Sequence, residues 1–179
     1  MKRNSAKNIT ILGLFVAFVC VISAIPLGFN ILGVAATLQT FAISFAGFVL
    51  GWKKGAATAA LYVLIGLILP VYSNMTSGPG ILFGPTGGFL WGFIPMAVLC
   101  GVSVKVKNMV VKAAVLVSSV MVCHILGLLQ FAIVTGSELI GSLMAVTLPY
   151  LPKDLVMVSL AWMVAQPVRK SARAYGLKL

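Results

Sequence analysis

The stretch Gly78-Pro-Gly-Ile-Leu-Phe-Gly-Pro-Thr-Gly-Gly-Phe-Leu-Trp-Gly-Phe93 packs six glycines and two prolines into the middle of a very apolar chain. Glycine permits turns and close backbone approach that a Cβ blocks, and proline is tolerated in the first turn of a helix. We therefore predict that residues 84–88 start a helix whose first backbone N–H groups face a partner. A tight turn between two helices is the alternative. At membrane depth such irregular backbone is tolerated only where it is buried or lines a cavity.

The sequence on both sides of this stretch has the composition of a membrane protein. Of its 179 residues, 61% are hydrophobic and only 8% are charged, and the mean hydropathy is +1.13. A bilayer core requires apolar spans of about 20 residues, so we predict an all-α integral membrane protein with a single transmembrane domain over residues 1–179. Cys20, Cys100 and Cys123 lack the spacing of metal ligands. We expect them to be small core residues, and we expect neither a metal nor a cofactor.

Apolar runs separated by charged or turn-forming residues predict six transmembrane helices. A signal peptide is the alternative for the first run, but its length and the spans that follow favour a retained helix. Gly28, Asn30 and Gly33 predict turns in the charge-free connection after it. The predicted spans are Ile9–Ile25, Leu38–Gly51, Gly55–Leu69, Pro85–Val104, Lys112–Thr135 and Lys153–Pro167.

The basic residues predict the orientation of this bundle. Three lie before the first span, two between spans two and three, three between spans four and five, and four after the last span, which makes twelve of thirteen on one side. Because basic loops stay in the cytoplasm, we predict that both termini are cytoplasmic. The opposite end then collects Thr37, Gln39, Asn74, Lys153 and Asp154 together with the Gly-Pro-Thr-Gly-Gly turn. We expect an outward-facing pocket there.

Polar residues within the apolar runs are the candidates for function. Asp154 heads the last span, where it either binds a ligand or caps the helix. Lys153 either attracts an anionic ligand or anchors the helix at the interface, and Thr37 has capping as its alternative. An amide in the middle of a span, as at Gln130, should face a partner or a cavity. We interpret His124 as an interhelical hydrogen-bonding residue in preference to a proton relay.

Several chemistries are not indicated. The Gly84–Gly88 turn lacks the Gly-Lys-Ser/Thr ending of a phosphate-binding loop, so we predict no ATP hydrolysis and no enzyme activity. A membrane-embedded enzyme would need His124 and Asp154 to meet, which a mid-span and a helix-end position disfavour. A channel would need a polar stripe across the cytoplasmic half, and the sequence has none. Basic residues confined to connections also argue against a nucleic-acid partner.

Small residues recur along the first span. Gly13, Ala17, Cys20 and Ala24 follow one another at spacings of four, three and four. This pattern leaves one helix face small, and in lipid such faces allow close helix packing. The partner is either the protein's own bundle or a separate subunit.

Four short segments resemble the BioY family, the biotin-binding S-components of energy-coupling-factor (ECF) transporters. They are Val34–Phe41, Ala46-Gly47, Leu50-Gly51, and Gly84–Phe89 with Gly92-Phe93. The resemblance covers about residues 25–162 and is most specific in the Gly-Pro-Thr-Gly-Gly turn. It implies a multi-pass protein of a prokaryotic plasma membrane, with six transmembrane helices and a vitamin pocket roofed by the connection after the first helix.

The resemblance also implies partners. A transmembrane coupling subunit would dock on Gly13 and Ala17, two cytoplasmic ATPase subunits would drive transport, and membrane lipid would surround the chain. In such complexes the substrate-binding protein is thought to topple within the membrane. No nucleic acid is implied.

The chain departs from the family at two positions. The family commonly has Pro-Gly-Asp-x-x-Lys at the head of the last helix, whereas here Met157 stands in place of that lysine. Gln130 stands where relatives often have an aromatic residue. We predict biotin as the ligand, with lipoate or a biotin precursor as the alternative.

We predict that Gln39, Asn74 and Asp154 bind the polar head of the ligand and that Phe89 and Tyr72 flank its apolar body. We also predict that Asp154→Ala weakens binding by about tenfold or more without disturbing folding. The full predicted binding set is Thr37, Gln39, Tyr72, Asn74, Thr86, Gly87, Phe89, Gln130, Lys153 and Asp154.

Overall fold

The structure is a computed structural model that describes residues 2–31 and 34–174. Most of the chain is helical, as predicted, and two strands follow the first helix. The helices are α1 (Lys2–Ala24), α2 (Gln39–Ile65), α3 (Pro79–Leu82), α4 (Gly87–Ser103), α5 (Met109–Thr135), α6 (Leu139–Ser142) and α7 (Leu151–Ala174). The strands are β1 (Pro26–Ile31) and β2 (Val34–Thr37), and two short helical turns are η1 (Ser73–Met75) and η2 (Leu143–Thr147).

The connection between α1 and α2 is an antiparallel β-hairpin. Asn30 pairs with Ala35 and Ile31 with Val34, and the register becomes irregular between Asn30 and Pro26. The predicted turn formers Gly28 and Asn30 therefore lie within a strand, whereas Gly33 lies outside the described residues. Strand pairing provides hydrogen-bond partners for backbone groups of these paired residues, in a segment that has no charged side chain.

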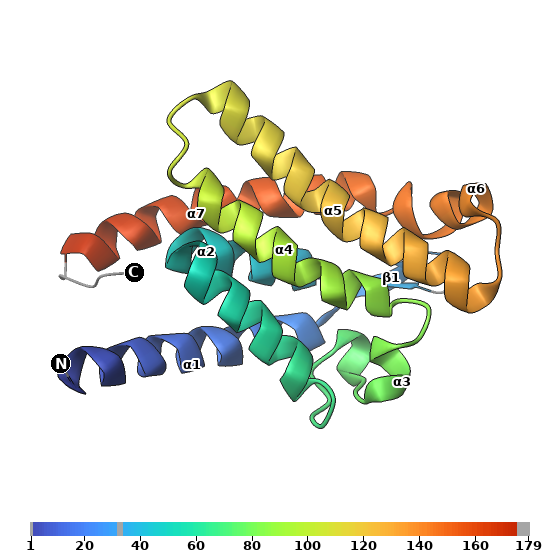
Figure 1. Cartoon of the computed structure of the whole chain (residues 1–179), viewed down its shortest axis with the longest axis horizontal. Coiled ribbons are helices and arrows are strands. Elements are labelled where there is room, and N and C mark those ends of the chain that lie inside the picture. Colours follow the sequence, from blue (N-terminus) through green and yellow to red (C-terminus); the bar gives the residue numbers. More distant parts are fainter. Residues whose placement is uncertain (1, 32–33, 175–179) are drawn as a thin grey trace.

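Helix α2 is broken at Gly51. This residue has φ 77° and ψ 175°, a conformation that side chains with a Cβ rarely adopt. Figure 1 shows the chain reversing at this point, so that the two halves of α2 run in opposite directions. The halves, residues 39–50 and 52–65, correspond to the second and third predicted spans.

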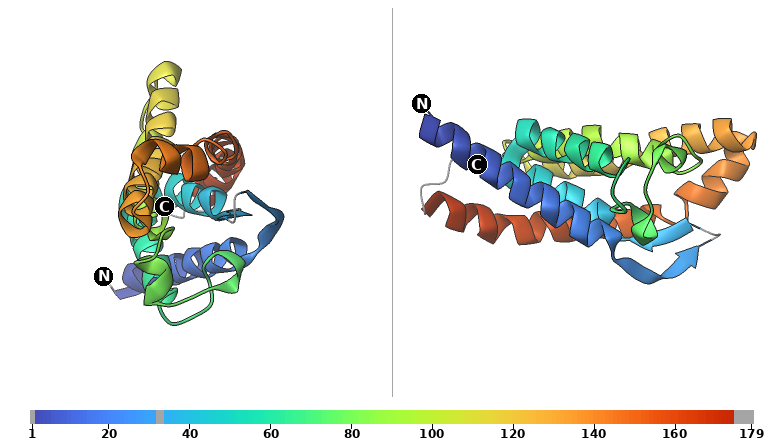
Figure 2. Two further views of the ribbon diagram at one scale, coloured as in Figure 1. Left: turned by 90° about the vertical axis from the view of Figure 1, so that its right-hand side faces the viewer. Right: turned by 90° about the horizontal axis from the view of Figure 1, so that it is seen from below.

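The two ends of the bundle differ in what they contain. The start of α1, the break in α2, the loop between α4 and α5, and the end of α7 lie together at one end (Figure 1). The hairpin, α3 and α6 lie at the other end, as the view from below in Figure 2 also shows. The chain segments that carry most of the basic residues thus lie at one end of the bundle, and the segments with few charged residues lie at the other end.

Helix α4 packs on both α2 and α5, and its first residues determine how closely α5 approaches. It begins at Gly87, in agreement with the predicted helix start. However, Gly87 N–H donates to the Gly84 carbonyl (3.1 Å) and Phe89 N–H to the Thr86 carbonyl (3.2 Å), so these groups are satisfied within the turn. A Cβ on Gly88 would collide with the Leu126 carbonyl of α5. The second glycine of the turn therefore serves helix packing.

The last helix is longer than predicted. Proline removes one helical hydrogen bond, and the sequence suggested that the helix ends at Pro167, yet α7 continues to Ala174. Beyond the proline, Arg169 Nη1 donates to the carbonyl oxygens of Phe48 and Val49, just before the break in α2. This contact between helices stabilises the segment that the proline would otherwise weaken.

Several helices have the length and composition to cross a membrane. Within the described residues these are Ala6–Ala24 and Met109–Thr135, together with Gln39–Ile65 if its break at Gly51 is disregarded. The segments Leu139–Thr147 and Leu151–Ala174, which are bent by 46°, provide a fourth if they form one span. Helix α4 is apolar but shorter. The predicted membrane protein is confirmed at this level, while the number of six spans stays a prediction.

Candidate functional site

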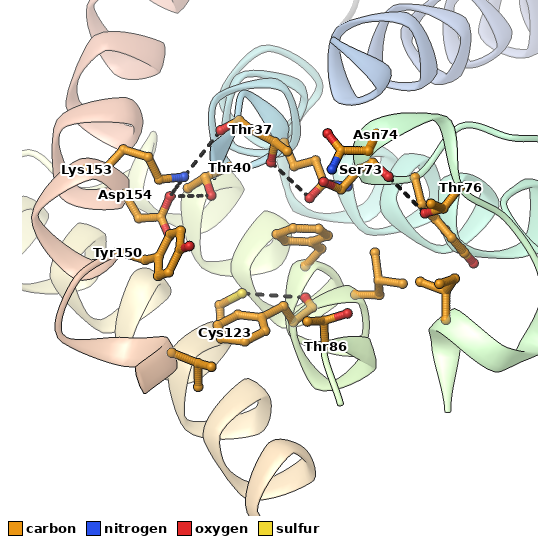
Figure 3. Close-up of a pocket in the computed structure, with 17 residues that line it drawn as sticks. Thr37, Thr40, Ser73, Asn74, Thr76, Thr86, Cys123, Tyr150, Lys153 and Asp154 are labelled. Atoms are coloured by element: carbon orange, nitrogen blue, oxygen red, sulfur yellow. Dashed lines mark hydrogen bonds and ion pairs between the residues drawn. The ribbon is translucent and has the colours of Figure 1, made fainter. Parts of the chain in front are cut away.

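A cavity of about 230 Å³ lies at the hairpin end of the bundle. It is far larger than the space of about 10–15 Å³ that one water molecule needs. Figure 3 shows Lys153 and Asp154 of α7, with Tyr150 just before this helix, on one side of the cavity. The 73–76 segment lies on the opposite side. The walls are formed by Thr37, Gln39, Thr40, Tyr72, Ser73, Asn74, Thr76, Ile81, Thr86, Phe89, Leu90, Phe93, Cys123, Val146, Tyr150, Lys153 and Asp154.

Asp154, in the first turn of α7, is the centre of a buried polar cluster. Its Oδ1 accepts a hydrogen bond from Thr40 Oγ1 (2.7 Å) and lies 2.6 Å from Lys153 Nζ. Its Oδ2 lies 3.0 Å from His124 Nε2. The residue is only 7% exposed. All three partners are side chains, two of them from other helices, so these contacts bind helices together and do not cap α7.

Lys153 connects this cluster to the hairpin. Its Nζ donates to the Thr37 carbonyl of β2 (3.2 Å) and lies 5.9 Å from the centroid of the Tyr150 ring. The ammonium group has three N–H donors, of which Asp154 and Thr37 use two. The lysine therefore neutralises the aspartate and keeps one donor for another group.

The prediction that His124 and Asp154 lie too far apart to meet is wrong. Their hydrogen bond places the first turn of α7 beside the middle of α5, next to a break at which the approach to α7 bends by 46°. His124 is 2% exposed, and the interhelical hydrogen bond expected of it is present. It does not line the cavity.

Gln39 belongs to a second hydrogen-bonded chain. Thr37 Oγ1 donates to Gln39 Oε1 (3.1 Å), and Gln39 Nε2 donates to the Tyr62 hydroxyl (2.7 Å). The neighbouring Tyr72 donates to the Val63 carbonyl (2.5 Å), and burial raises the pKa of its phenol, so the phenol remains a neutral donor. Thr37 thus bonds Gln39, and no side-chain cap of α2 is formed.

Asn74 reaches the cavity from a strained segment. Asn74 (φ 54°) and Met75 (φ 56°) are consecutive non-glycine residues in the left-handed region, which asparagine tolerates better than methionine. Thr76 holds the segment, because its Oγ1 donates to the Ser73 carbonyl (2.8 Å) and its carbonyl accepts from Tyr72 N–H (3.0 Å). Strain of this kind is concentrated at functional sites.

Eight of the ten predicted binding residues line the cavity, and Gly87 and Gln130 do not. Gln130 Nε2 donates to the carbonyl oxygens of Leu82 (3.0 Å) and Gly84 (2.8 Å). A Cβ on Gly87 would lie 2.5 Å from the same Nε2. These two residues therefore hold the turn that carries Thr86 into the cavity.

The sequence analysis did not identify some of the residues that line the cavity. Thr40, a polar residue beside Gln39 in an apolar run, was the clearest signal that it overlooked. Cys123 resembles a core cysteine, since its Sγ lies 3.5 Å from the Phe89 carbonyl, although it also faces the cavity. Tyr150 gave no signal, because the bend before α7 determines its direction.

Comparison with known proteins identifies relatives of similar sequence and a solved structure of similar fold. The sequence profile of the BioY family matches residues 1–174. A protein of Rhodobacter capsulatus named "Biotin transporter BioY" is 33% identical over 179 residues, which cover 90% of this chain and 93% of that protein. A protein of the same name from Thermotoga maritima is 41% identical over 99 residues, which cover 54% and 56%.

Among solved structures, the S-component for biotin from an ECF-type ABC transporter has the same fold. The TM-score is 0.83 over 95% of this chain and 94% of that one, at 22% sequence identity. Because the family profile covers nearly the whole sequence and a relative a third identical aligns over nine-tenths of it, the chain belongs to the BioY family.

Proposed function

We propose that this chain is the membrane-embedded substrate-binding component of an ECF-type importer and that it binds biotin in the cavity at the hairpin end. The observation that carries the proposal is the division of the cavity wall. Polar side chains occupy two opposite sides (Figure 3), and the apolar residues Phe89, Leu90 and Phe93 also line the cavity. Biotin is likewise polar at both ends and apolar in the middle. The names of the relatives support the same ligand.

The remaining hydrogen-bonding capacity suggests how the ligand lies. A carboxylate accepts about four hydrogen bonds, and Asp154 uses three. One acceptor position at Asp154 and one N–H at Lys153 remain, and they match the N–H and carbonyl of a cyclic urea. The sequence analysis placed Asn74 with Asp154 at the polar head of the ligand. Because Asn74 lies across the cavity from Asp154, we assign it instead to the opposite, carboxylate end of biotin.

Six spans with both termini in the cytoplasm of a prokaryote fit this arrangement. Lys53 and Lys54 lie beside the break in α2, and Lys54 Nζ donates to Asn8 of α1 (3.1 Å). These lysines lie at the end opposite the cavity, where α7 also ends. The positive-inside rule would place that end in the cytoplasm and the cavity outside. A reporter fused to either terminus and found active outside the cell would contradict this orientation.

The surface of α1 supports docking on a separate subunit. Gly13 and Ala17 are exposed, whereas Val16 and Val19 on another face of the helix are buried. Cys20, farther along the same face, is half-buried and packs against the core, so only the Gly13 and Ala17 part of the small face is free within the described bundle. We propose that it contacts a transmembrane coupling subunit, with two cytoplasmic ATPase subunits supplying the energy and lipid covering the rest.

Two alternatives make different predictions. Met157 stands where the family commonly has a lysine, and this departure leaves a related small carboxylate such as lipoate or a biotin precursor as the alternative ligand. A membrane-embedded enzyme is favoured by the contact between His124 and Asp154, but His124 does not line the cavity. A ligand in the cavity would therefore meet Asp154 without meeting the histidine.

Titration of the detergent-purified protein with biotin, by calorimetry, tests the proposal. We expect saturable binding with one biotin per chain, and competition by lipoate only at much higher concentration. Mass spectrometry of ligand that copurifies with the protein provides an independent identification. Absence of biotin binding, or tighter binding of lipoate, would overturn the assignment.

A further inference from the structure

The single histidine of the chain lies directly behind the cavity wall. His124 Nε2 is 3.0 Å from Asp154 Oδ2. Its ring also meets the Phe89 ring edge to face, with centroids 5.5 Å apart and planes at 88°. Asp154 and Phe89 both line the cavity, whereas His124 does not. The histidine therefore acts on the ligand site only through these two neighbours.

The surroundings of the imidazole determine which nitrogen carries the proton. Ionised Asp154 is only an acceptor, so the contact requires a hydrogen on Nε2. Nδ1 is buried and has no hydrogen-bond partner within the described part of the chain. A second proton on Nδ1 would create a buried, charged donor without a partner, and Lys153 already balances the charge of Asp154. A neutral ring protonated on Nε2 is the form that fits.

We propose that His124 is a positioning residue, whose Nε2–H fixes the plane of the Asp154 carboxylate so that one free acceptor position points into the cavity. The assignment rests on the proposed function and deepens it, because it selects ligands that present an N–H donor, such as cyclic ureas. Lys153 and Thr40 both contact Oδ1, so His124 is the partner that the described structure gives to Oδ2. Without it, the carboxylate is held through one oxygen and can rotate.

Substitutions at His124 separate positioning from packing. Glutamine places its amide nitrogen near the position of Nε2, whereas asparagine reaches only to about the position of Nδ1. Leucine fills much of the volume and donates nothing. We expect His124→Gln to bind biotin within about threefold of the unmodified protein, and His124→Asn and His124→Leu to bind about tenfold more weakly or worse. A purely structural role does not predict that the two amides differ.

Nitrogen NMR gives a second readout that needs no ligand. With ¹⁵N-labelled histidine and a purification tag free of histidine, the protein gives a single imidazole. We expect a protonated Nε2 and an unprotonated Nδ1 in the free protein, and a changed Nε2 shift with the same tautomer when biotin binds. The opposite tautomer, an imidazolium, or equal biotin affinity of all three variants would overturn the assignment.

The two readouts also separate this inference from the proposed function. If the unmodified protein does not bind biotin, the proposed function fails, and the selection of ureido ligands by His124 fails with it. If biotin binds and the three variants bind alike, only the assignment of His124 fails. Thermal unfolding of each variant, measured in the same detergent, shows whether weaker binding merely reflects loss of the fold.

Discussion

Removing the charge of Asp154 should destabilise the protein as well as weaken ligand binding. The sequence analysis predicted that Asp154→Ala weakens binding and leaves folding intact. In the structure the side chain is 11% exposed and contacts Thr40, His124 and Lys153. The sharper perturbation is Asp154→Asn, which keeps the shape but removes the charge and turns one acceptor into a donor.

The size of the effect follows from the partners that lose the carboxylate. Breaking a buried ion pair by removing one member costs about 3–5 kcal/mol. The Lys153 side chain is 16% exposed and keeps the Thr37 carbonyl, so we expect the lower limit, about 3 kcal/mol. Lys153→Met should cost a similar amount. In the double variant no charge remains unpaired, so its loss should be smaller than the sum of the two single losses by about 2 kcal/mol.

Thermal unfolding in one detergent measures all three variants. For a chain of this size, about 3 kcal/mol corresponds to a melting temperature lower by about 6–12 °C. Glu138, the other acidic residue, is exposed. Glu138→Gln is therefore the matched control, and its melting temperature should equal that of the unmodified protein. An Asp154→Asn variant as stable as the unmodified protein, or strictly additive losses in the double variant, would refute the reasoning.

Two further predictions test the packing and the cavity. Gly88→Ala should lower the melting temperature, because the new Cβ would collide with the Leu126 carbonyl, whereas Gly80→Ala, with nothing within 4 Å of the new Cβ, should leave it unchanged; equal losses would contradict the role given to Gly88. In a variant with Cys123 as its only cysteine, biotin should slow labelling by a small uncharged maleimide, because Cys123 lines the cavity. Labelling at the same rate with saturating biotin would place the ligand elsewhere.

Much of the site followed from the sequence because charge and turn residues act locally. Twelve of thirteen basic residues fall in alternate connections, and that pattern identified the hairpin end as the charge-poor one before any contact was known. The start of α4 was readable from Gly84–Gly88, since few other residues suit such a turn. The helix start is encoded in five consecutive residues, and the charge pattern needs only the positions of basic residues along the chain, so neither depends on how the helices pack.

Contacts that depend on how helices bend could not be read in this way. His124 and Asp154 meet close to a 46° bend at the approach to α7, and the residue spacing predicted neither the bend nor the contact. The break at Gly51 was predicted, by contrast, because Lys53 and Lys54 follow this glycine and interrupt the apolar run. The position of Arg169 against α2 explains a helix that runs past Pro167, and that contact joins residues about 120 positions apart.

The same limit applies to polar residues inside the spans. Each must find a partner in the membrane, but the sequence does not say whether that partner is protein or ligand. Gln130 donates both N–H groups of its amide to the carbonyl oxygens of Leu82 and Gly84, so its amide nitrogen has no N–H free for a ligand. Gln39 donates one N–H to the Tyr62 hydroxyl, and its second amide N–H remains available. Asp154 likewise has one acceptor position available. Recognition in this cavity therefore depends on partly used groups, which favours a ligand with alternating donors and acceptors over one that offers charge alone.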